Sequence, residues 1–327
     1  MDAVLLLFAV LYLLFGAFIA KSSLSIITLP RFCATITKSA LMKPEFKPFL
    51  RLNDSVVQIP SRMEICFRAM IFGPLRWLAV VLLVLMAGLS TFVCDKDRVA
   101  ACTRFVARGL LLSLGVTVKY VGRRAAVTEA ACLVSNHVSA LDMLALAAEG
   151  GAFVGKSAAR DIPCIGRVCE CIGCIFVARD SVESRSAAKQ AIVERLKKSG
   201  ESQLVIFPEG TTTNGRGLLQ FRRGAFEACV PVQPVRIEYS NLECSMTLLG
   251  TVDLISYLSA WPRSEMTLHY LPVVKCDQKS SPDETAEKCR NAIAFAKGVY
   301  SPIPLELFAC GSDRDEHLLM SYINKKP

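Results

Sequence analysis

Two long runs of apolar residues stand within the first hundred positions of the chain. They cover residues 3–20 (AVLLLFAVLYLLFGAFIA) and residues 77–94 (WLAVVLLVLMAGLSTFVC). Eighteen uncharged residues are near the lower limit for a helix that spans a bilayer. Asp2 stands where a cleavable signal peptide would carry positive charge, so we interpret the first run as a retained anchor. The pattern therefore predicts a membrane-anchoring region over residues 1–98.

The segment between the two runs is strongly basic. Residues 21–76 carry nine lysines and arginines but only three acids. The positive-inside rule places such a segment in the cytosol. A second complete crossing would then move the cysteine-containing remainder out of the cytosol, so we favour a re-entrant or in-plane hairpin for the second run. Glycosylation at the sequon Asn53-Asp54-Ser55 would contradict this topology.

After residue 98 the pattern changes to short segments with alternating strand-like and helix-like periods. Strands are predicted at residues 116–122, 131–135, 152–156, 174–179, 203–210, 230–239 and 265–274. Helices are predicted at residues 99–115 (an amphipathic, interfacial helix), 142–148, 184–198 and 281–299. This alternation predicts an α/β fold, a single mixed-sheet domain over residues 99–300 flanked by helices. Residues 301–327 then form a C-terminal tail.

Composition favours a membrane or another anionic surface as a partner. The chain of 327 residues is 52% hydrophobic, has a mean hydropathy of +0.40 and carries a net charge of +9. It shows no zinc finger, RNA-binding aromatic signature or Lys/Arg-rich tract, so we predict no nucleic-acid partner. The fourteen scattered cysteines are interpreted as reduced thiols that pack as small hydrophobes in a domain facing the cytosol.

Two motifs are present whose context argues against the chemistry they suggest. Residues 150–157 have the G-x4-G-K-S spacing of a phosphate-binding loop, but the expected preceding strand is missing and AFV itself resembles a strand. Residues 164–174 have C-x4-C-x-C-x2-C spacing that could bind zinc, yet the residues between the cysteines are apolar and favour packing. We predict no metal and no cofactor. No G-x-S-x-G elbow of a serine hydrolase is present.

The stretch CLVSNHVSALDMLAL, residues 132–146, places His137 five residues before Asp142. On one continuous helix this spacing would leave the two side chains about 140° apart. They meet only if His137 lies in the turn after a strand and Asp142 lies in the first turn of the next helix. A carboxylate on one imidazole nitrogen would then leave the other nitrogen as a general base. Spacing alone does not distinguish this arrangement from an ordinary polar residue after a strand.

A second polar segment, VIFPEGTTTNG, follows a predicted buried strand at residues 205–215. The strand delivers Glu209 to its carboxyl end, and a loop rich in hydroxyl and basic side chains comes next. Ligands bind at such strand ends in α/β sheets. A plain polar loop fits the segment equally well when it is considered alone.

Together these segments resemble the glycerolipid acyltransferases that carry a PlsC-like domain. NHVSALD is similar to the family's NHx4D motif. GCIFVARD (173–180), FPEGT (207–211) and VPVQPV (230–235) resemble the three further blocks of the family, in family order. FVGKSAARDIPCIG (153–166) also resembles a family segment, which accounts for the apparent phosphate-binding loop.

The resemblance implies an acyl-CoA-dependent O-acyltransferase. His137 would take the proton from the free hydroxyl of the acceptor, and Asp142 would orient His137; acyl-CoA would be a co-substrate, with no cofactor needed. Residues implied to bind substrate are Asn136, Arg179, Glu209, Gly210, Thr211, Thr212 and Pro231. Among them, Glu209, Gly210 and Thr211 would contact the acceptor's glycerophosphate. Arg179 would contact phosphate, and Pro231 would shape a strand beside the acyl site.

Within the family, EGTTTNG followed by FRRGAFEACVPVQPV is most similar to enzymes acting on lysophosphatidylcholine or lysophosphatidylethanolamine. Thr212 stands where lysophosphatidic acid enzymes usually carry Arg. Because a phosphate monoester suits a bidentate Arg better than a singly charged diester does, a lysophospholipid acceptor is favoured.

Alternative interpretations remain. One is an enzyme that acts on glycerol-3-phosphate or lysophosphatidic acid in place of a phosphodiester lysolipid, since some glycerol-3-phosphate enzymes also lack this Arg. Others are a membrane lipid-binding scaffold without activity, and a hydrolase or transacylase that needs no CoA. The family resemblance implies residence in the endoplasmic reticulum membrane, where membrane lipids surround the anchor.

Overall fold

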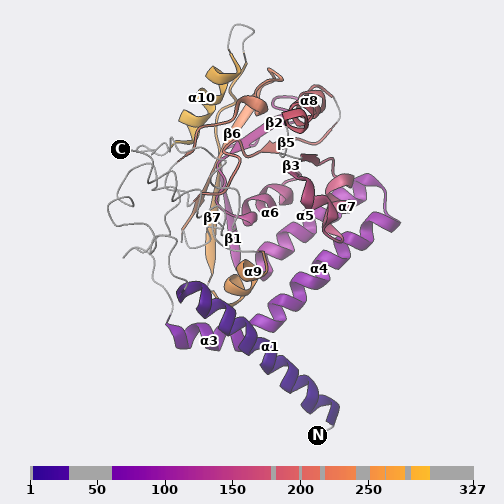
Figure 1. Cartoon of the computed structure of the whole chain (residues 1–327), viewed down its shortest axis with the longest axis vertical. Coiled ribbons are helices and arrows are strands. Elements are labelled where there is room, and N and C mark those ends of the chain that lie inside the picture. The colour runs from indigo at the N-terminus through magenta and orange to yellow at the C-terminus, as the bar shows by residue number, and fades with distance from the viewer. Residues whose placement is uncertain are drawn as a thin grey trace.

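In the computed structural model, one mixed β-sheet forms the centre of the molecule (Figure 1). The structure describes residues 3–28, 61–177, 182–198, 201–213, 218–240, 251–261, 263–276 and 281–294. Within them the sheet has seven strands in the order β1-β7-β6-β2-β5-β3-β4. The strands are β1 (Val116–Val121), β2 (Cys132–Ser135), β3 (Ala152–Lys156), β4 (Ile175–Val177), β5 (Leu204–Ile206), β6 (Val232–Tyr239) and β7 (Ser264–Tyr270).

The direction of the strands decides where loops meet. Strands β6, β2, β5, β3 and β4 run parallel, whereas β7 is antiparallel to β6 and parallel to the edge strand β1. The carboxyl ends of β2, β3, β5 and β6 therefore lie at one edge of the sheet. Ligand sites of α/β sheets form at such an edge. The predicted mixed-sheet α/β fold is confirmed.

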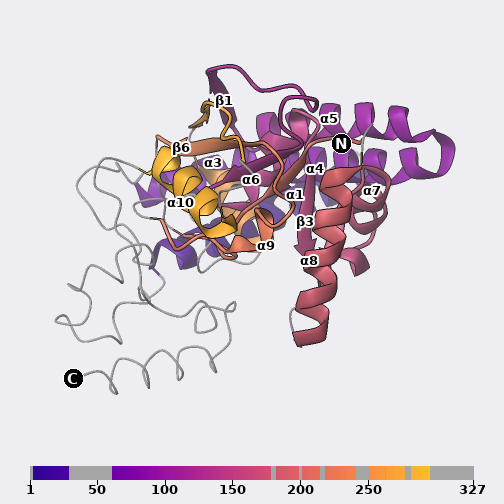
Figure 2. The same ribbon diagram turned by 90° about the horizontal axis from the view of Figure 1, so that it is seen from above.

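Helices cover both faces of the sheet (Figure 2). They are α1 (Ala3–Thr28), α3 (Arg62–Ile71), α4 (Gly73–Val93), α5 (Lys96–Ser113), α6 (Ala140–Ala148), α7 (Ile165–Cys171), α8 (Val182–Lys197), α9 (Thr251–Ala260) and α10 (Pro282–Ile293). One core cluster packs α5, α6 and α9 against the first face. A second cluster packs α8 and α10 against the other face. Each face of the sheet thus has its own helical layer.

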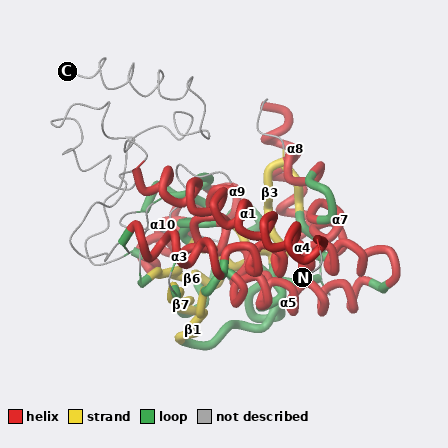
Figure 3. Tube along the Cα trace, turned by 90° about the horizontal axis from the view of Figure 1, so that it is seen from below, coloured by secondary structure: helices red, strands yellow, loops and turns green. Residues whose placement is uncertain are grey.

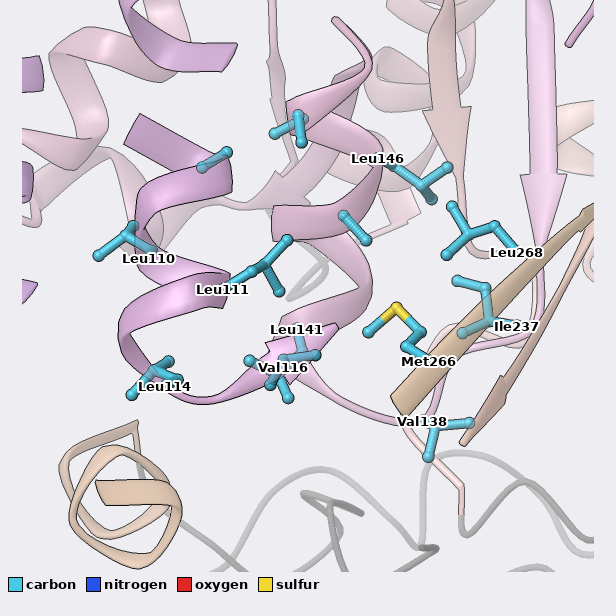
Figure 4. Close-up of a cluster of buried hydrophobic side chains, with 14 of the residues drawn as sticks. Leu110, Leu111, Leu114, Val116, Val138, Leu141, Leu146, Ile237, Met266 and Leu268 are labelled. Atoms are coloured by element: carbon cyan, nitrogen blue, oxygen red, sulfur yellow. The ribbon is translucent and has the colours of Figure 1, made fainter. Parts of the chain in front are cut away.

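The first core cluster holds the helix that begins at the candidate site (Figure 4). Leu141 and Leu146 of α6 lie against Ile237 of β6 and Leu268 of β7, and all four side chains are buried. Fully burying one such side chain contributes about 1.5–3 kcal/mol. Because α6 is held along its buried side, its amino end is fixed relative to the carboxyl edge of the sheet.

The helices α1, α3 and α4 gather at one end of the molecule (Figure 3). The carboxyl half of α1 packs on α3 and α9 through Ile19, Ala20 and Ser23, which are buried. Side chains of the amino half, from residue 6 to residue 15, are mostly exposed and apolar. Both α1 and α4 are long and apolar enough to cross a membrane by length and composition.

Helix α4 packs along the α/β domain over its whole length. Near its amino end, Arg76 donates hydrogen bonds to the carbonyls of Leu258, Ser259 and Trp261 at the end of α9. Near its carboxyl end, Gly88 approaches α7 so closely that a Cβ would lie 2.6 Å from Sγ of Cys164. The helix runs through Gly88 without a break.

Most sequence-predicted elements are confirmed, with ends shifted by a few residues. The predicted interfacial segment 99–115 is helix α5, which packs on α4 and α6. Helices α3, α7 and α9 were not predicted. Helix α7 has only seven residues and begins after Cys164, which has a φ of 65°. Seven residues are too few to show a helical period in the sequence. The proposed boundaries at residues 98 and 300 stay predictions.

One expectation about the cysteines is wrong. Cys229 and Cys276 form a disulfide, so the thiols are not all reduced. The bond joins the segment before β6 to the segment after β7, two strands that are neighbours in the sheet. Their proximity could not be read from positions that lie 47 residues apart. Nine other described cysteines are free, including those of the 164–174 cluster.

Candidate active site

The site begins where β2 ends and the chain turns away from the sheet. Ser135 is the last residue of β2 and pairs with Val235 of β6. The side chain of Asn136 then takes the place of the backbone, because its amide donates to the carbonyl of Ile237 and accepts from the N–H of Ile237. This substitution continues the ladder for one step while the backbone is released to turn. His137 lies in that turn.

Asp142 lies in the first turn of α6, at the third helical position. Ser139 is the N-cap, and the two residues form a capping box. Oδ2 of Asp142 also lies 2.9 Å from Nδ1 of His137 and accepts from the backbone N–H groups of Val138 and Ser139. The predicted arrangement, with histidine in the turn and aspartate in the helix, is confirmed. The carboxylate that starts the helix is the one that holds the imidazole.

Asp142 is completely buried and fully supplied with donors. Besides the three groups on Oδ2, its Oδ1 accepts from the hydroxyl of Tyr239, the last residue of β6. A buried carboxylate is costly unless such donors compensate for lost hydration. The charge of Asp142 is thereby stabilised beside the imidazole. Nδ1 of His137 carries the proton in this arrangement, and Nε2 keeps a lone pair.

The imidazole of His137 is held on its flat side as well. It stacks on the ring of Phe207, with ring centroids 4.1 Å apart and planes 17° apart. Phe207 follows β5 directly and stacks in turn on Phe153 of β3. The His137 side chain is 15% exposed. Residues on or directly after the neighbouring parallel strands β2, β5 and β3 therefore hold the imidazole ring of His137. Its Nε2 faces away from Asp142.

Glu209 links the loop after β5 to the histidine. Oε1 accepts from the backbone N–H of His137, and Oε2 accepts from the backbone N–H of Leu219. The side chain is fully buried, and this burial raises the pKa of Glu209 to about 8 although the two N–H donors act in the opposite direction. Both oxygens accept from backbone N–H groups, so Glu209 fixes the loop that carries His137.

The loop after Glu209 forms the rim of the site. Gly210 has a φ of +74°, which only glycine adopts readily, and closes a turn onto the carbonyl of Phe207. Arg222 lies over it, since a Cβ on Gly210 would be 2.9 Å from Nε of Arg222. Thr211 and Thr212 are half-buried beside this turn. The backbone N–H of the next residue in the chain donates to the carbonyl of His137.

Two predicted residues are not brought to this group. Pro231 is exposed and comes before β6 at the amino edge of the sheet, whereas His137 lies at the carboxyl edge. The register Cys132 to Val232 fixes that separation. Arg179 lies outside the described residues.

The sequence interpretation did not identify Tyr239, Phe207 or Arg222 as members of the site. The signal for Phe207 was its place directly before Pro208 and Glu209. The signal for Arg222 was its basic neighbourhood in FRRG. Tyr239 is the last residue of β6, and only the β2–β6 register brings it to Asp142. In the part of the chain that the structure describes, no group of three or more His, Cys, Asp and Glu residues is placed to hold a metal ion.

Comparison with known families matches this region. Residues 117–238 match the model of the Acyltransferase family. The matched residues include the side chains of the site from Asn136, which follows β2, to Arg222, and the match ends one residue before Tyr239.

Curated proteins with similar sequences are lysophospholipid acyltransferases by name. The chain is 28% identical over 262 residues to lysophosphatidylcholine acyltransferase 2 of Homo sapiens, covering 73% of this chain and 48% of that protein. It is 29% identical to lysophosphatidylcholine acyltransferase 1 of Rattus norvegicus, covering 79% and 53%. It is 39% identical over 113 residues to lysophospholipid acyltransferase LPEAT1 of Arabidopsis thaliana, covering 33% and 28%. The chain spans about half the length of the first two relatives.

One solved structure is similar to part of this chain. It is the 1-acyl-sn-glycerophosphate acyltransferase PlsC from Thermotoga maritima, which is 19% identical. The alignment covers 73% of this chain and 100% of that chain, with a TM-score of 0.48.

Proposed function

We propose that the protein transfers an acyl chain from acyl-CoA to the free hydroxyl of a lysophospholipid, with His137 as general base. The observation that carries this proposal is the bond of 2.9 Å between Nδ1 of His137 and Oδ2 of the buried Asp142. It selects the tautomer of the neutral imidazole that carries its proton on Nδ1, so that Nε2 can accept a proton. The match of residues 117–238 to the Acyltransferase family supports acyl transfer as the reaction class.

The proposed reaction needs one proton relay and no covalent enzyme intermediate. Nε2 of His137 takes the proton of the acceptor hydroxyl while its oxygen attacks the thioester carbonyl. Asp142 stabilises the imidazolium that results. The C–S bond then breaks, the CoA thiolate leaves, and the proton on His137 can pass to it. A thioester is already activated and a thiolate is a good leaving group, so positioning and base catalysis supply the acceleration.

The acceptor we propose is a phosphodiester lysolipid, of the lysophosphatidylcholine or lysophosphatidylethanolamine type. Thr212 offers a neutral hydroxyl where lysophosphatidic acid enzymes usually carry a guanidinium. Arg222, over Gly210, supplies one positive charge at the rim of the site. One charge suits one diester phosphate. The names of the curated relatives support the same acceptor class.

We propose that α4 lies in the plane of the membrane and does not cross it. Its exposed side is an apolar stripe at helical spacing, made of Leu75, Leu78, Leu82, Leu85, Leu89 and Phe92. Its opposite side is packed on α5, α7 and α9 from one end to the other. A helix with protein along its whole length on one side and apolar side chains on the other suits an interface. Lysolipid and acyl-CoA both gather at that interface.

The membrane we propose is that of the endoplasmic reticulum, with the acyltransferase domain on the cytosolic side. The basic segment of residues 21–76 and the nine free cysteines support this side. The Cys229–Cys276 disulfide favours an oxidising compartment and is the observation that opposes it. Protease protection of sealed microsomes tests the proposal: digestion of the domain without detergent supports it, and protection or glycan addition at Asn53 contradicts it.

A panel of acceptors tests the activity directly. Purified full-length protein in vesicles is incubated with labelled acyl-CoA and, separately, lysophosphatidylcholine, lysophosphatidylethanolamine, lysophosphatidic acid and glycerol-3-phosphate. We expect labelled phospholipid from one or both phosphodiester acceptors. Preference for a monoester would overturn the acceptor class. Acyl exchange between unlabelled phospholipid and lysolipid without CoA would indicate a transacylase, and no transfer from any donor would favour a lipid-binding scaffold.

A further inference from the structure

The hydroxyl of Tyr239 reaches the carboxylate that holds the candidate catalytic histidine. It donates to Oδ1 of Asp142 at 2.5 Å, while Oδ2 holds Nδ1 of His137. Asp142 is 0% exposed and Tyr239 is 7% exposed, so water does not compete freely for either oxygen. The three side chains come from the β2 turn, α6 and β6, and form one chain of hydrogen bonds.

We infer that Tyr239 is a positioning residue that sets the protonation state of His137 through Asp142. A hydrogen bond to one oxygen of a carboxylate draws charge toward that oxygen and weakens the hold of the other on an imidazolium. Tyr239 thus limits how strongly Asp142 stabilises protonated His137. At neutral pH this leaves more of the histidine in the neutral form that a base requires. The inference rests on the proposed function of His137.

Other charged groups around His137 define the background for this effect. Glu209, from the loop after β5, engages the backbone N–H of His137 and not its ring. Arg222 lies over Gly210 at the rim. On the ring itself the described contacts are Asp142 and the uncharged Phe207. Because Asp142 is the acidic group on the imidazole, a change in its hydrogen bonds is expected to reach the histidine.

Removing the hydroxyl alone tests the inference. In Tyr239→Phe the ring and its packing stay, and Asp142 loses one of four donors. His137 should then remain protonated to a higher pH, by about 0.5–1 pH unit. The rate at pH 6.5 should fall about three- to tenfold, and the loss should become smaller as the pH rises toward 8.5, because protonation of the base then limits the variant less. KM for the acceptor should not change.

A matched control is available on the neighbouring strand. Tyr270 of β7 is also 7% exposed, and its buried hydroxyl has no hydrogen-bond partner among the described residues. Tyr270→Phe makes the same chemical change at the same depth in the same sheet. It should leave the pH–rate profile unchanged. An equal loss in both variants, or a loss in Tyr239→Phe that is the same at every pH, would mean a general packing defect and would overturn the inference.

A readout besides activity separates this inference from the proposed function. The chain has only three histidines, so histidine-labelled protein gives few NMR signals, and His137→Ala assigns one of them. The midpoint of the His137 titration should move to higher pH in Tyr239→Phe but not in Tyr270→Phe, while His269, bonded to Glu238, serves as an internal reference. An unmoved midpoint overturns the inference even if acyl transfer is confirmed. A moved midpoint supports it even if the reaction of His137 differs from the proposed one.

Discussion

The two ends of the central strands carry two buried hydrogen-bond networks of different chemistry. At the amino edge, the neutral amides of Gln203 and Gln233 are bonded to the backbone of residues 123–130 and to the carbonyl of Leu271. At the carboxyl edge, the carboxyl groups of Asp142 and Glu209 accept hydrogen bonds from the backbone N–H groups of residues 137–139 and 219. Both networks fix a loop against the same sheet.

The difference between the networks lies in what each leaves available. An amide both donates and accepts, so Gln203 and Gln233 bond N–H and carbonyl groups of the loop and add no charge of their own, while Gln203 also accepts from Nε of Arg124. A carboxylate only accepts, so Asp142 needs donors, and one of them is the imidazole of His137. The carboxyl edge therefore pairs negative charge with a group that can gain a proton. Both networks hold a loop through side-chain hydrogen bonds to its backbone, but only the network at the carboxyl edge also contains a group that can take up a proton.

The largest effect is expected when the charge at the carboxyl edge is removed. In Asp142→Asn the amide oxygen can still accept from His137, and its nitrogen can donate to the oxygen of Tyr239. The shape is kept but the imidazolium loses its counter-charge. We expect kcat for acyl transfer to fall at least about 100-fold, with the thermal midpoint near that of wild type. Activity within about fivefold of wild type would show that the two networks do not differ in the way described.

A loss of stability without loss of chemistry is expected at the amino edge. Gln233→Leu leaves the N–H of Ala125 and the carbonyls of Arg123 and Leu271 without their partner. The loss of one buried and two partly buried hydrogen bonds should cost about 2–4 kcal/mol of the free energy of unfolding. Turnover per folded molecule should be unchanged. Thermal unfolding with parallel rate assays checks both, and Gln190→Leu, at an exposed position, is the control.

Glu209 lies at the carboxyl edge of the sheet and bonds to the backbone N–H of His137. Glu209→Gln removes its ability to titrate while it keeps a polar side chain of similar size. The raised pKa means that the native state holds a proton that the unfolded state has lost between about pH 4.5 and pH 8. Its contribution to stability is fully present below about pH 4.5 and is lost as the pH rises through 8. Wild type should therefore lose stability over this range by up to about 1 kcal/mol per pH unit relative to Glu209→Gln. Parallel pH dependences of the two thermal midpoints would contradict this.

The smallest effect is expected at the rim. Arg222 lies over Gly210, whereas the adjacent Arg223 pairs with Glu227. Arg222→Ala should raise KM for a lysophospholipid about three- to tenfold with little change in kcat, as loss of one charge-assisted phosphate contact implies. Arg223→Ala should change neither constant. Acceptor titrations of the two variants at saturating acyl-CoA make the comparison, and equal values would remove Arg222 from the site.

Most of the carboxyl edge could be predicted from the sequence because its signals are local. The S-x-x-D spacing of Ser139 and Asp142, together with a strand before His137, determines the turn and the helix start. Tyr239 could not be predicted, since its contact with Asp142 depends on the register between β2 and β6 across 97 residues. The engagement of both Glu209 oxygens was missed for the same reason. The parallel β2–β5 pairing brings His137 to Glu209, and Leu219 returns to Glu209 from later in the connection between β5 and β6.

The fold itself was predictable where the period was long or the strand was buried. Strand β2 and helix α8 have clear patterns, and both lie where the sequence places them. Helix α9 was missed because its sequence, TVDLISYLSA, has β-branched and apolar residues that suit several structures, and its packing on α1 and α4 decides the outcome. The Cys229–Cys276 pair likewise follows from neighbouring strands and not from local sequence.

The most direct test of the account is the rate of acyl transfer by His137→Ala in vesicles with labelled acyl-CoA and lysophosphatidylcholine. His269→Ala is the matched control, because His269 bonds to Glu238 and does not contact Asp142 in the described hydrogen bonds. We predict that His137→Ala loses at least about 1,000-fold of the rate and keeps its membrane association and thermal midpoint, while His269→Ala stays near wild type. Near-normal turnover by His137→Ala would contradict the assignment of His137 as the base.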